Sequence, residues 1–158
     1  MTPAAQLLTP GSPVRVLAAS EPLGCCCFVS AWVLALAGRI PAGDTLNAWA
    51  RAAPQGWWAR ANLWPPAPPW ENLDAYRELV GGDLFPAGDV GEVPPLVVDR
   101  WHIAQEWSAG FGTGHTYIVS PSQVLHDSAY SRGYRERSTA WPRRKNRAVG
   151  LLVLPGGV

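Results

Sequence analysis

The segment from Cys25 to Ala37 constrains the fold more than any other part of this chain. It reads CCCFVSAWVLALA, which is apolar on every face of a helix. A helix without a polar face is buried in a protein core. Gly38 is suited to the end of such a helix, and Pro41 prevents its continuation. We therefore expect a buried helix over Cys25–Ala37, with the rest of the core built around it.

Size and composition are those of one folded domain. The chain has 158 residues, of which 47% are hydrophobic, so residues 1–158 can form a single domain with its own core. The 16 glycines and 16 prolines predict short elements joined by irregular backbone. The formal net charge of +1 argues against a nucleic-acid-binding protein, which is usually strongly basic. The basic run Arg143–Lys145 is too short to change this, and we expect it at a solvated surface.

Neither a membrane span nor a secretory signal is expected. No stretch reaches the roughly 18 apolar residues that are needed to cross a bilayer. Residues Met1–Pro13 lack the basic run followed by an apolar block that marks a secretory signal. We therefore expect synthesis in the cytoplasm, with later release by cell lysis or by signal-independent secretion left open.

The regions on either side of the apolar segment carry weaker signals. Residues 1–22 are expected to form an irregular arm with room for a short strand at Val14–Leu17. After the apolar segment, Asp44 or Thr45 can cap a second helix that continues to about Ala53.

Residues 54–70 form an insertion rich in proline and tryptophan, PQGWWARANLWPPAPPW, without a clear period. We interpret it as an ordered loop or lid, because fully exposed tryptophans are costly. A third helix is expected over about Glu71–Val80, because Pro69 precedes it and Gly81 and Gly82 follow it.

The second half of the chain is expected to consist mainly of strands. These strands are expected at 96–107, 115–119, 124–127 and 148–154, with loops at 83–95 and 110–114. The two central strands form a hairpin around Ser120–Ser122. Helices followed by strands predict an α+β domain with an antiparallel sheet.

The three cysteines, Cys25, Cys26 and Cys27, are consecutive. Neighbouring cysteines do not readily close a disulfide with each other, and no other cysteine is present to pair with them. Their spacing does not match that of a zinc site either. We therefore expect no metal and no cofactor, and at least one free thiol with another role.

Cys25 is the best placed of the three to act as a nucleophile. It directly follows Gly24 at the expected start of the buried helix. The partial positive charge and unpaired N–H groups of a helix N-terminus favour a thiolate, which is the nucleophilic form of cysteine. The same N–H groups can help to bind an oxyanion.

A thiolate that acts on an acyl group needs an imidazole to take and return protons. Of the three histidines, His115 follows GFGTG and begins an apolar strand, which makes it the best candidate. The residue that orients His115 depends on the register of the hairpin. Asp127 shares its face if the residue opposite His115 is odd-numbered, and His126 shares it if that residue is even-numbered. We favour Asp127, because a carboxylate stabilises an imidazolium better.

Two runs in the chain resemble the NlpC-type cell-wall peptidases. Their D-C-S-G-F-V motif is similar to G-C-C-C-F-V at 24–29, and aligning Phe28 and Val29 selects Cys25 as the nucleophile. Their H-V-G-I-Y … F-I-H-A-S pattern is similar to H-T-Y-I-V at 115–119 and V-L-H-D-S at 124–128. This chain has a glycine where the family has aspartate, and a longer interval between cysteine and histidine. The resemblance implies a papain-like fold and puts the third catalytic residue at His126 or its neighbour Asp127.

Two related groups resemble other parts of the same region. The C-W-A-F-S-A motif of papain is similar to C-C-F-V-S-A at 26–31, which moves the nucleophile to Cys26. Transglutaminase-like proteins carry G-I-P-A after their cysteine helix, and this chain has G-R-I-P-A at 38–42. All three groups imply related thiol chemistry, so the sequence leaves the substrate more open than the catalytic residues.

The resemblance implies a cysteine hydrolase in which Cys25 attacks, His115 moves the proton and Asp127 orients His115. The implied substrate is an amide or peptide bond, above all in peptidoglycan peptides, as in a phage lysis or tail component or a bacterial toxin. Such a protein can also have an immunity or assembly partner, which the sequence does not identify.

Trp57 and Trp58 are the candidates from the insertion for contact with substrate, and Gln105 is a candidate donor to an oxyanion. Two other functions remain open at the level of sequence. One is a transglutaminase-like acyl transferase that uses the same residues. The other is a phage or bacterial binding module without activity, in which the cysteine site is a relict.

Overall fold

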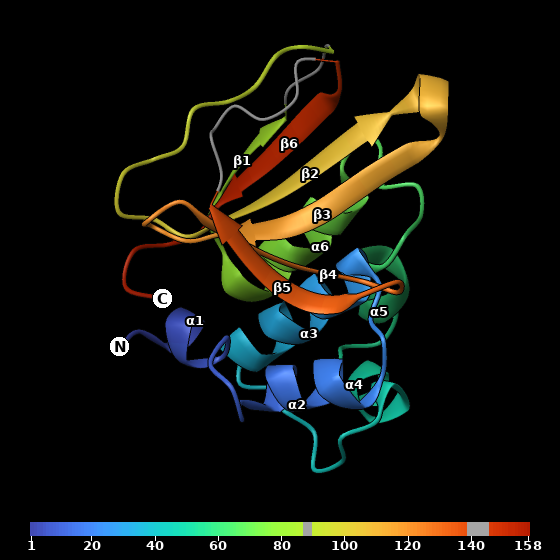
Figure 1. The fold of residues 1–158 in the computed structure, drawn as a ribbon, viewed down its shortest axis with the longest axis vertical. Helices are drawn as coiled ribbons and strands as arrows, with labels where there is room; N and C mark the ends of the chain where they lie inside the picture. The colour runs from blue at the N-terminus through green and yellow to red at the C-terminus, as the bar shows by residue number, and fades with distance from the viewer. Residues whose placement is uncertain (87–89, 139–145) are drawn as a thin grey trace.

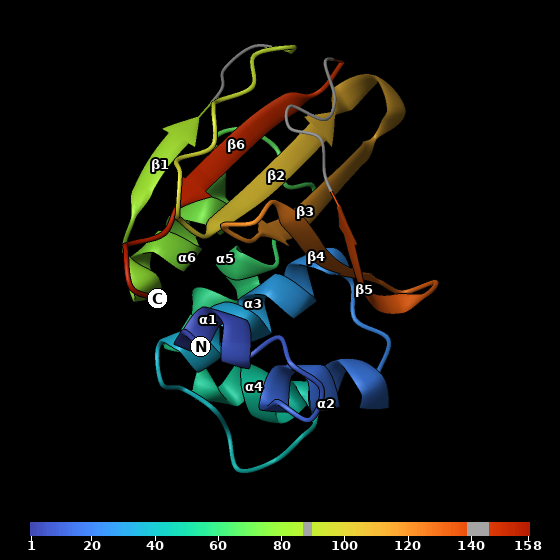
Figure 2. The same ribbon diagram turned by 60° about the vertical axis from the view of Figure 1, so that its left-hand side comes forward.

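The structure, a computed structural model, describes residues 1–86, 90–138 and 146–158. These residues form a mixed α+β fold of six α-helices and one antiparallel sheet of six strands. The helices gather on one side of the sheet, and α3 lies between the sheet and the other N-terminal helices (Figures 1 and 2). The expected α+β class and antiparallel sheet are therefore confirmed. The basic run Arg143–Lys145 lies outside the described residues.

The N-terminal region is helical, so the expected arm with a strand at Val14–Leu17 was wrong. It forms α1, Pro3–Gln6, and α2, Pro13–Ser20. The Ser12 side chain caps α2 by accepting a hydrogen bond from the Arg15 N–H, and proline occupies the first helical position. The buried residues of α2 are spaced three and four apart, namely Val14, Leu17 and Ala18.

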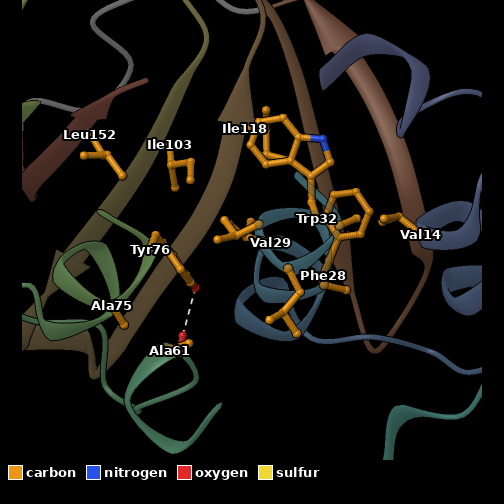
Figure 3. Close-up of a cluster of buried hydrophobic side chains, with 14 of the residues drawn as sticks. Val14, Phe28, Val29, Trp32, Ala61, Ala75, Tyr76, Ile103, Ile118 and Leu152 are labelled. Carbon is orange, nitrogen blue, oxygen red and sulfur yellow. Dashed lines mark hydrogen bonds between the residues drawn. The ribbon is translucent and has the colours of Figure 1, made fainter. Parts of the chain in front are cut away.

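The buried helix expected from the sequence is α3, Cys25–Leu36, and it begins directly after Gly24. Nine of its twelve residues are buried. Figure 3 shows the side chains of Phe28, Val29 and Trp32 within the core, among residues from α2, α6 and the sheet. This helix is therefore the centre of the domain.

Three further helices follow, α4 at Leu46–Ala52, α5 at Trp57–Ala61 and α6 at Glu71–Val80. Thr45, one of the two expected caps, accepts a hydrogen bond from the Ala48 N–H at the start of α4. The bounds of α6 are those expected, and it ends at Gly81, whose φ of +76° is unfavourable for other residues.

The insertion at 54–70 is less irregular than expected, because it contains α5. Trp57 and Ala61 lie one turn apart on α5 and are both buried. The Tyr76 hydroxyl of α6 donates a hydrogen bond of 2.8 Å to the Ala61 carbonyl, shown as a dashed line in Figure 3. These contacts attach the insertion to the core.

The sheet has the strand order β1-β6-β2-β3-β4-β5, and all neighbours are antiparallel. The strands are β1 Asp83–Pro86, β2 His102–Ser108, β3 Thr113–Val119, β4 Val124–Ala129, β5 Gly133–Ser138 and β6 Ala148–Val153. A 3-10 turn, Ala109–Phe111, joins β2 to β3. The hairpin of β3 and β4 and the last strand are those expected from the sequence.

Three features of the sheet differ from the expectation. β1 lies in the region that was expected to be a loop, and β5 was not expected because GYRERS has no apolar pattern. β2 begins at His102 rather than at residue 96. Asp99 has a φ of +60°, which interrupts the extended chain before this strand.

The two faces of the sheet have different neighbours. Ile103, Ile118 and Leu152 belong to the core cluster that contains α3 (Figure 3). The alternate residues form a second apolar cluster on the other face, which includes Tyr117 and Leu125. Side chains on β3 and β4 therefore reach either α3 or the opposite face, according to their position in the pleat.

Candidate active site

The start of α3 lies at the opening between β3 and β4. These two strands pair only at Ile118–His126 and Val119–Leu125, and they diverge toward the beginning of β3. The Ser128 hydroxyl of β4 donates a hydrogen bond of 2.8 Å to the Leu23 carbonyl, just before the helix. The first turn of α3 therefore occupies the space that a longer ladder between β3 and β4 would fill.

At this opening, the backbone N–H of Thr116 on β3 points toward Cys25. The Ser120 N–H donates to the Val124 carbonyl at 2.9 Å, so alternate residues of β3 present their amide groups toward β4. Thr116 is one of these residues. Because β4 has moved away at this point, the Thr116 N–H instead donates a hydrogen bond to the thiol group of Cys25.

His115 and Asp127 lie together on the face of the sheet opposite to α3. The pairing of Ile118 with His126 puts even-numbered residues of this hairpin on one face, and His115 and Asp127 on the other. The distance from His115 Nε2 to Asp127 Oδ2 is 2.7 Å. His126 therefore does not contact His115. Since Nε2 is bound by the carboxylate, Nδ1 is the atom of the ring that faces Cys25.

Three arginines balance the charge of Asp127, and the most distant is Arg137, whose Nη2 lies 3.7 Å from Oδ2. The Asp127 side chain is fully buried, and Oδ1 lies 3.0 Å from Arg135 Nε and 3.0 Å from Arg132 Nη2. Burial raises the pKa of this carboxyl, but the hydrogen bonds from His115 and Arg135 outweigh burial and leave the pKa below its usual range. Asp127 is therefore a carboxylate that presents a fixed negative charge to the imidazole.

The imidazole itself is poised to hold a proton. Burial lowers the pKa of His115, but its hydrogen bonds with Asp127 and Cys25 outweigh burial and raise the pKa above the ordinary value. The ring of Tyr117 lies beside it, with centroids 5.6 Å apart. This environment favours an imidazolium next to the sulfur of Cys25.

The three thiols differ sharply in acidity. The hydrogen bond from Cys26 is the largest cause that lowers the pKa of Cys25, and with help from His115 it brings that pKa to about 4, against the effect of burial. The same hydrogen bond raises the pKa of Cys26, and burial raises the pKa of Cys27. Of the three, Cys25 is the thiol that is already ionised at neutral pH.

A chain of buried polar groups lies behind Cys25. Gln105 Nε2 donates to Thr116 Oγ1 at 3.2 Å, and this oxygen lies 3.4 Å from Cys26 Sγ. Because the Nε2 group of Gln105 can only donate, the Thr116 hydroxyl can turn its hydrogen toward Cys26, whose own hydrogen can then point to Cys25. Gln105 is fully buried here and does not line the pocket, so the expectation that it contacts an oxyanion was wrong.

A pocket of about 490 Å³ opens beside Cys25 and His115. Its other lining residues are Gly24, Cys26, Cys27, Asn62, Trp64, Gly114, Ser128, Ala129 and Tyr130. A ligand in this pocket can reach both the sulfur and the imidazole. The arrangement can therefore attack a bound acyl group and pass its proton to a leaving group.

The tryptophans of the insertion are not placed as expected. Trp57 is 1% exposed and donates its indole N–H to the Ala75 carbonyl at 2.6 Å. Trp58 is half-buried and packs against the core, and neither side chain lines the pocket. The tryptophan of this insertion that lines the pocket is Trp64, which lies beyond the end of α5 and before two prolines. The sequence does contain a signal for this difference. Trp57 and Ala61 are four residues apart, as on one face of a buried helix, whereas the prolines after Trp64 do not allow such a helix to continue.

Within the described ranges, no group of three or more histidine, cysteine, aspartate or glutamate side chains is arranged to hold a metal ion. The helices of those ranges include none with the length and apolar character needed to cross a membrane. The fold and site together define an α+β domain with a cysteine, a histidine and an aspartate in contact. Comparisons with known protein families, with curated proteins and with solved structures found no match.

Proposed function

We propose that this protein is a cysteine hydrolase of papain-like fold that cleaves an amide or peptide bond. The observation that carries the proposal is the contact of the Cys25 thiol group with His115, whose Nε2 lies 2.7 Å from the buried carboxylate of Asp127. The order of the three residues along the chain and the buried helix that begins at the cysteine support a papain-like arrangement.

The reaction begins when the Cys25 thiolate attacks the carbonyl carbon of the substrate. The negative charge that develops on the carbonyl oxygen needs hydrogen-bond donors. The first helical N–H in the ladder is that of Phe28, which donates to the Gly24 carbonyl at 3.1 Å, so the N–H groups at the very start of α3 precede the ladder. Gly24 has no side chain to cap them. These N–H groups are the oxyanion donors in our proposal.

His115 then gives its proton to the departing amine, which leaves an acyl group on the sulfur. Water attacks this thioester, and the imidazole takes a proton from the water. It keeps that proton when the thiolate is released, which restores the starting thiolate–imidazolium pair and frees the carboxylic acid product. Asp127 keeps Nε2 occupied throughout, so the proton that moves is the one on Nδ1. Every step uses residues that line or adjoin the same pocket.

Peptidoglycan peptides are the first substrates to test, because the motifs around Cys25 and His115 resemble those of cell-wall peptidases. Cell-wall fragments are incubated with the protein and the products are separated by mass spectrometry. We expect cleavage that is lost in Cys25→Ala. Cys27→Ser is the matched thiol control and should keep most of the activity, because the pKa of Cys27 is raised rather than lowered. Full activity of Cys25→Ala would contradict the proposal.

The same acyl-enzyme can in principle pass its acyl group to an amine, which is the alternative of an acyl transferase. Adding a primary amine and measuring new amide product separates the two reactions. The pH dependence of Cys25 alkylation with iodoacetamide distinguishes the hydrolase from a binding module with a relict site. An ordinary thiol loses about tenfold in rate for each pH unit below its pKa, whereas a thiol of low pKa keeps its rate down to mildly acidic pH.

A further inference from the structure

Two exposed aromatic side chains, Trp64 and Tyr130, line the pocket beside Cys25. Trp64 is 55% exposed and Tyr130 is 72% exposed. Among the tryptophans that the structure describes, Trp64 is the only exposed one. Large apolar side chains that remain exposed and gather at one place are typical of a surface that a ligand covers.

Tyr130 is held over the chain immediately before the nucleophile. A Cβ atom at Gly24 would lie 2.8 Å from the Tyr130 ring, so a glycine is needed for the ring to rest there. The Tyr130 hydroxyl also forms a hydrogen bond with the Cys27 thiol. Tyr130 follows β4, so it belongs to the β4–β5 turn (Figure 2).

Trp64 is fixed near the start of β3, on which His115 lies. Its ring contacts that of Trp107 edge to face, with centroids 6.4 Å apart and the ring planes at 90°. The following segment also lies against β3, because a Cβ atom at Gly114 would be 2.9 Å from Pro66 Cγ. Trp64 and Tyr130 thus reach the same pocket from two separate parts of the chain.

Among the described residues that line the pocket, none offers a charged partner to a ligand other than the proposed catalytic pair. None of the residues that line it is an aspartate, glutamate, lysine or arginine. The amide of Asn62 is already engaged, since Oδ1 accepts from the Ser30 hydroxyl at 2.9 Å and Nδ2 donates to the Trp58 carbonyl at 2.8 Å. A ligand carboxylate or ammonium that lies against Trp64 and Tyr130, away from the reacting groups, would therefore lose hydration without gaining a charged partner.

We propose that the pocket binds an uncharged apolar group of the substrate, next to the bond that Cys25 attacks, and that Trp64 and Tyr130 select it. This inference rests on the hydrolase function proposed above and narrows its substrate class. Among cell-wall peptides it favours cleavage beside an apolar residue such as alanine. It disfavours cleavage in which the carboxylate of a glutamate or diaminopimelate side chain enters the pocket.

Three thiol-directed probes test this inference on the whole protein. They are iodoacetamide, N-benzyl-2-iodoacetamide and N-(4-carboxybenzyl)-2-iodoacetamide, and the second-order rate constant for alkylation of Cys25 is measured with each by peptide mapping. We expect the benzyl probe to react about tenfold faster than iodoacetamide, since two aromatic contacts of about threefold each combine to that factor. The carboxybenzyl probe should lose that advantage.

Variants of the two aromatic residues then assign the preference to them. In Trp64→Ala and in Tyr130→Ala, the ratio of the benzyl rate to the iodoacetamide rate should fall from about tenfold to about threefold, because one aromatic contact remains in each variant. Tyr130→Phe keeps the ring and should keep the ratio. Phe85→Ala, which removes an exposed aromatic side chain on β1 outside the pocket, is the matched control and should also keep it. If Trp64→Ala does not fold, Trp64→Leu provides the same comparison of ratios.

The outcomes separate this inference from the function on which it rests. Equal rates for the benzyl and carboxybenzyl probes, or an equal ratio in Trp64→Ala, Tyr130→Ala and the native protein, would overturn the inference. The hydrolase proposal would survive that result if iodoacetamide still alkylates Cys25 at a rate that holds from pH 8 to pH 6. A rate that falls about tenfold per pH unit over that range would overturn the hydrolase proposal itself.

Discussion

Two histidine sites lie on opposite faces of β4, and only one of them has the features of an active site. On one face Asp127 contacts His115 beside Cys25. On the other face the neighbouring residue, His126, contacts Tyr134 and through it Glu136. Adjacent residues of a strand point to opposite faces, so a single step along the chain separates the two sites.

The cluster around His126 also contains an acid, Glu136, but it differs from the cluster around His115 in burial and in the pKa of its histidine. The distance from His126 Nδ1 to the Tyr134 hydroxyl oxygen is 2.8 Å, and this hydroxyl donates to Glu136 at 2.8 Å. The Glu136 side chain is 53% exposed, whereas that of Asp127 is fully buried. Burial lowers the pKa of His126, while the contacts of His115 raise its pKa. A buried, fixed carboxylate and a neighbouring thiol therefore distinguish the His115 cluster from the His126 cluster.

The largest expected effect is the loss of activity when the two histidines are replaced in turn. We expect His115→Ala to lower kcat/KM by about 10³-fold or more, because the thiolate loses its proton partner. The kcat/KM of His126→Gln should stay within about threefold of the native value, since His126 does not reach Cys25. The measurement is hydrolysis of the substrate identified with cell-wall fragments, with thermal melting as a control for folding. Equal losses in both variants would remove the distinction between the sites.

The second prediction compares the two acids. Asp127→Asn should lower kcat/KM by about 10²-fold, because an amide orients the imidazole but does not stabilise its positive charge. Glu136→Gln should have little effect on the rate, since its partner Tyr134 lies on the other face. A loss of rate in Glu136→Gln as large as that in Asp127→Asn would show that the two clusters act together.

Much of this site was predictable because its signals are local. The all-apolar run after Gly24 predicts a buried helix, and a cysteine at its start follows directly from the sequence. The turn residues at 120–122 place the hairpin, which brings His115 close to residues 126 and 127. The choice between His126 and Asp127 depended on the parity of the register, which the sequence of the turn does not determine.

The parts that were not predictable depend on tertiary packing. Gln105 and Trp57 have the right chemistry for a binding site, but both are buried by elements far away in the sequence. The strand β5 carries polar residues at most positions and is recognised only through its pairing with β4. Its Arg135 contacts Asp127, so an element without an apolar pattern supplies part of the charge balance of the site.

The third prediction concerns the hydrogen bond that Cys26 donates to Cys25. Among the residues that the structure describes, the cluster around His126 has no counterpart to it. Cys26→Ala removes the largest cause that lowers the pKa of Cys25, so the acid limb of the pH–rate profile should move upward from about pH 4. Cys26→Ser retains a donor and should shift the limb less. Thiolate absorbance at 240 nm and the pH dependence of alkylation both report this change. An unchanged acid limb in Cys26→Ala would mean that His115 and the Thr116 N–H suffice to hold the thiolate.

The smallest expected effect is a difference in how the two histidines link pH to stability. The pKa of His126 is lowered in the folded protein, so its contribution to stability is present above its ordinary pKa of 6.5 and is lost as pH falls below it. The pKa of His115 is raised, so its contribution is present below 6.5 and is lost as pH rises through the raised value. Titration of the two imidazole C–H resonances by NMR should give pKa values on opposite sides of 6.5. Urea unfolding should show a weaker decline of stability between pH 7 and pH 5 in His126→Gln than in the native protein. If both rings titrate on the same side of 6.5, the difference between the two faces of β4 is one of position alone, and the electrostatic basis for assigning catalysis to His115 is lost.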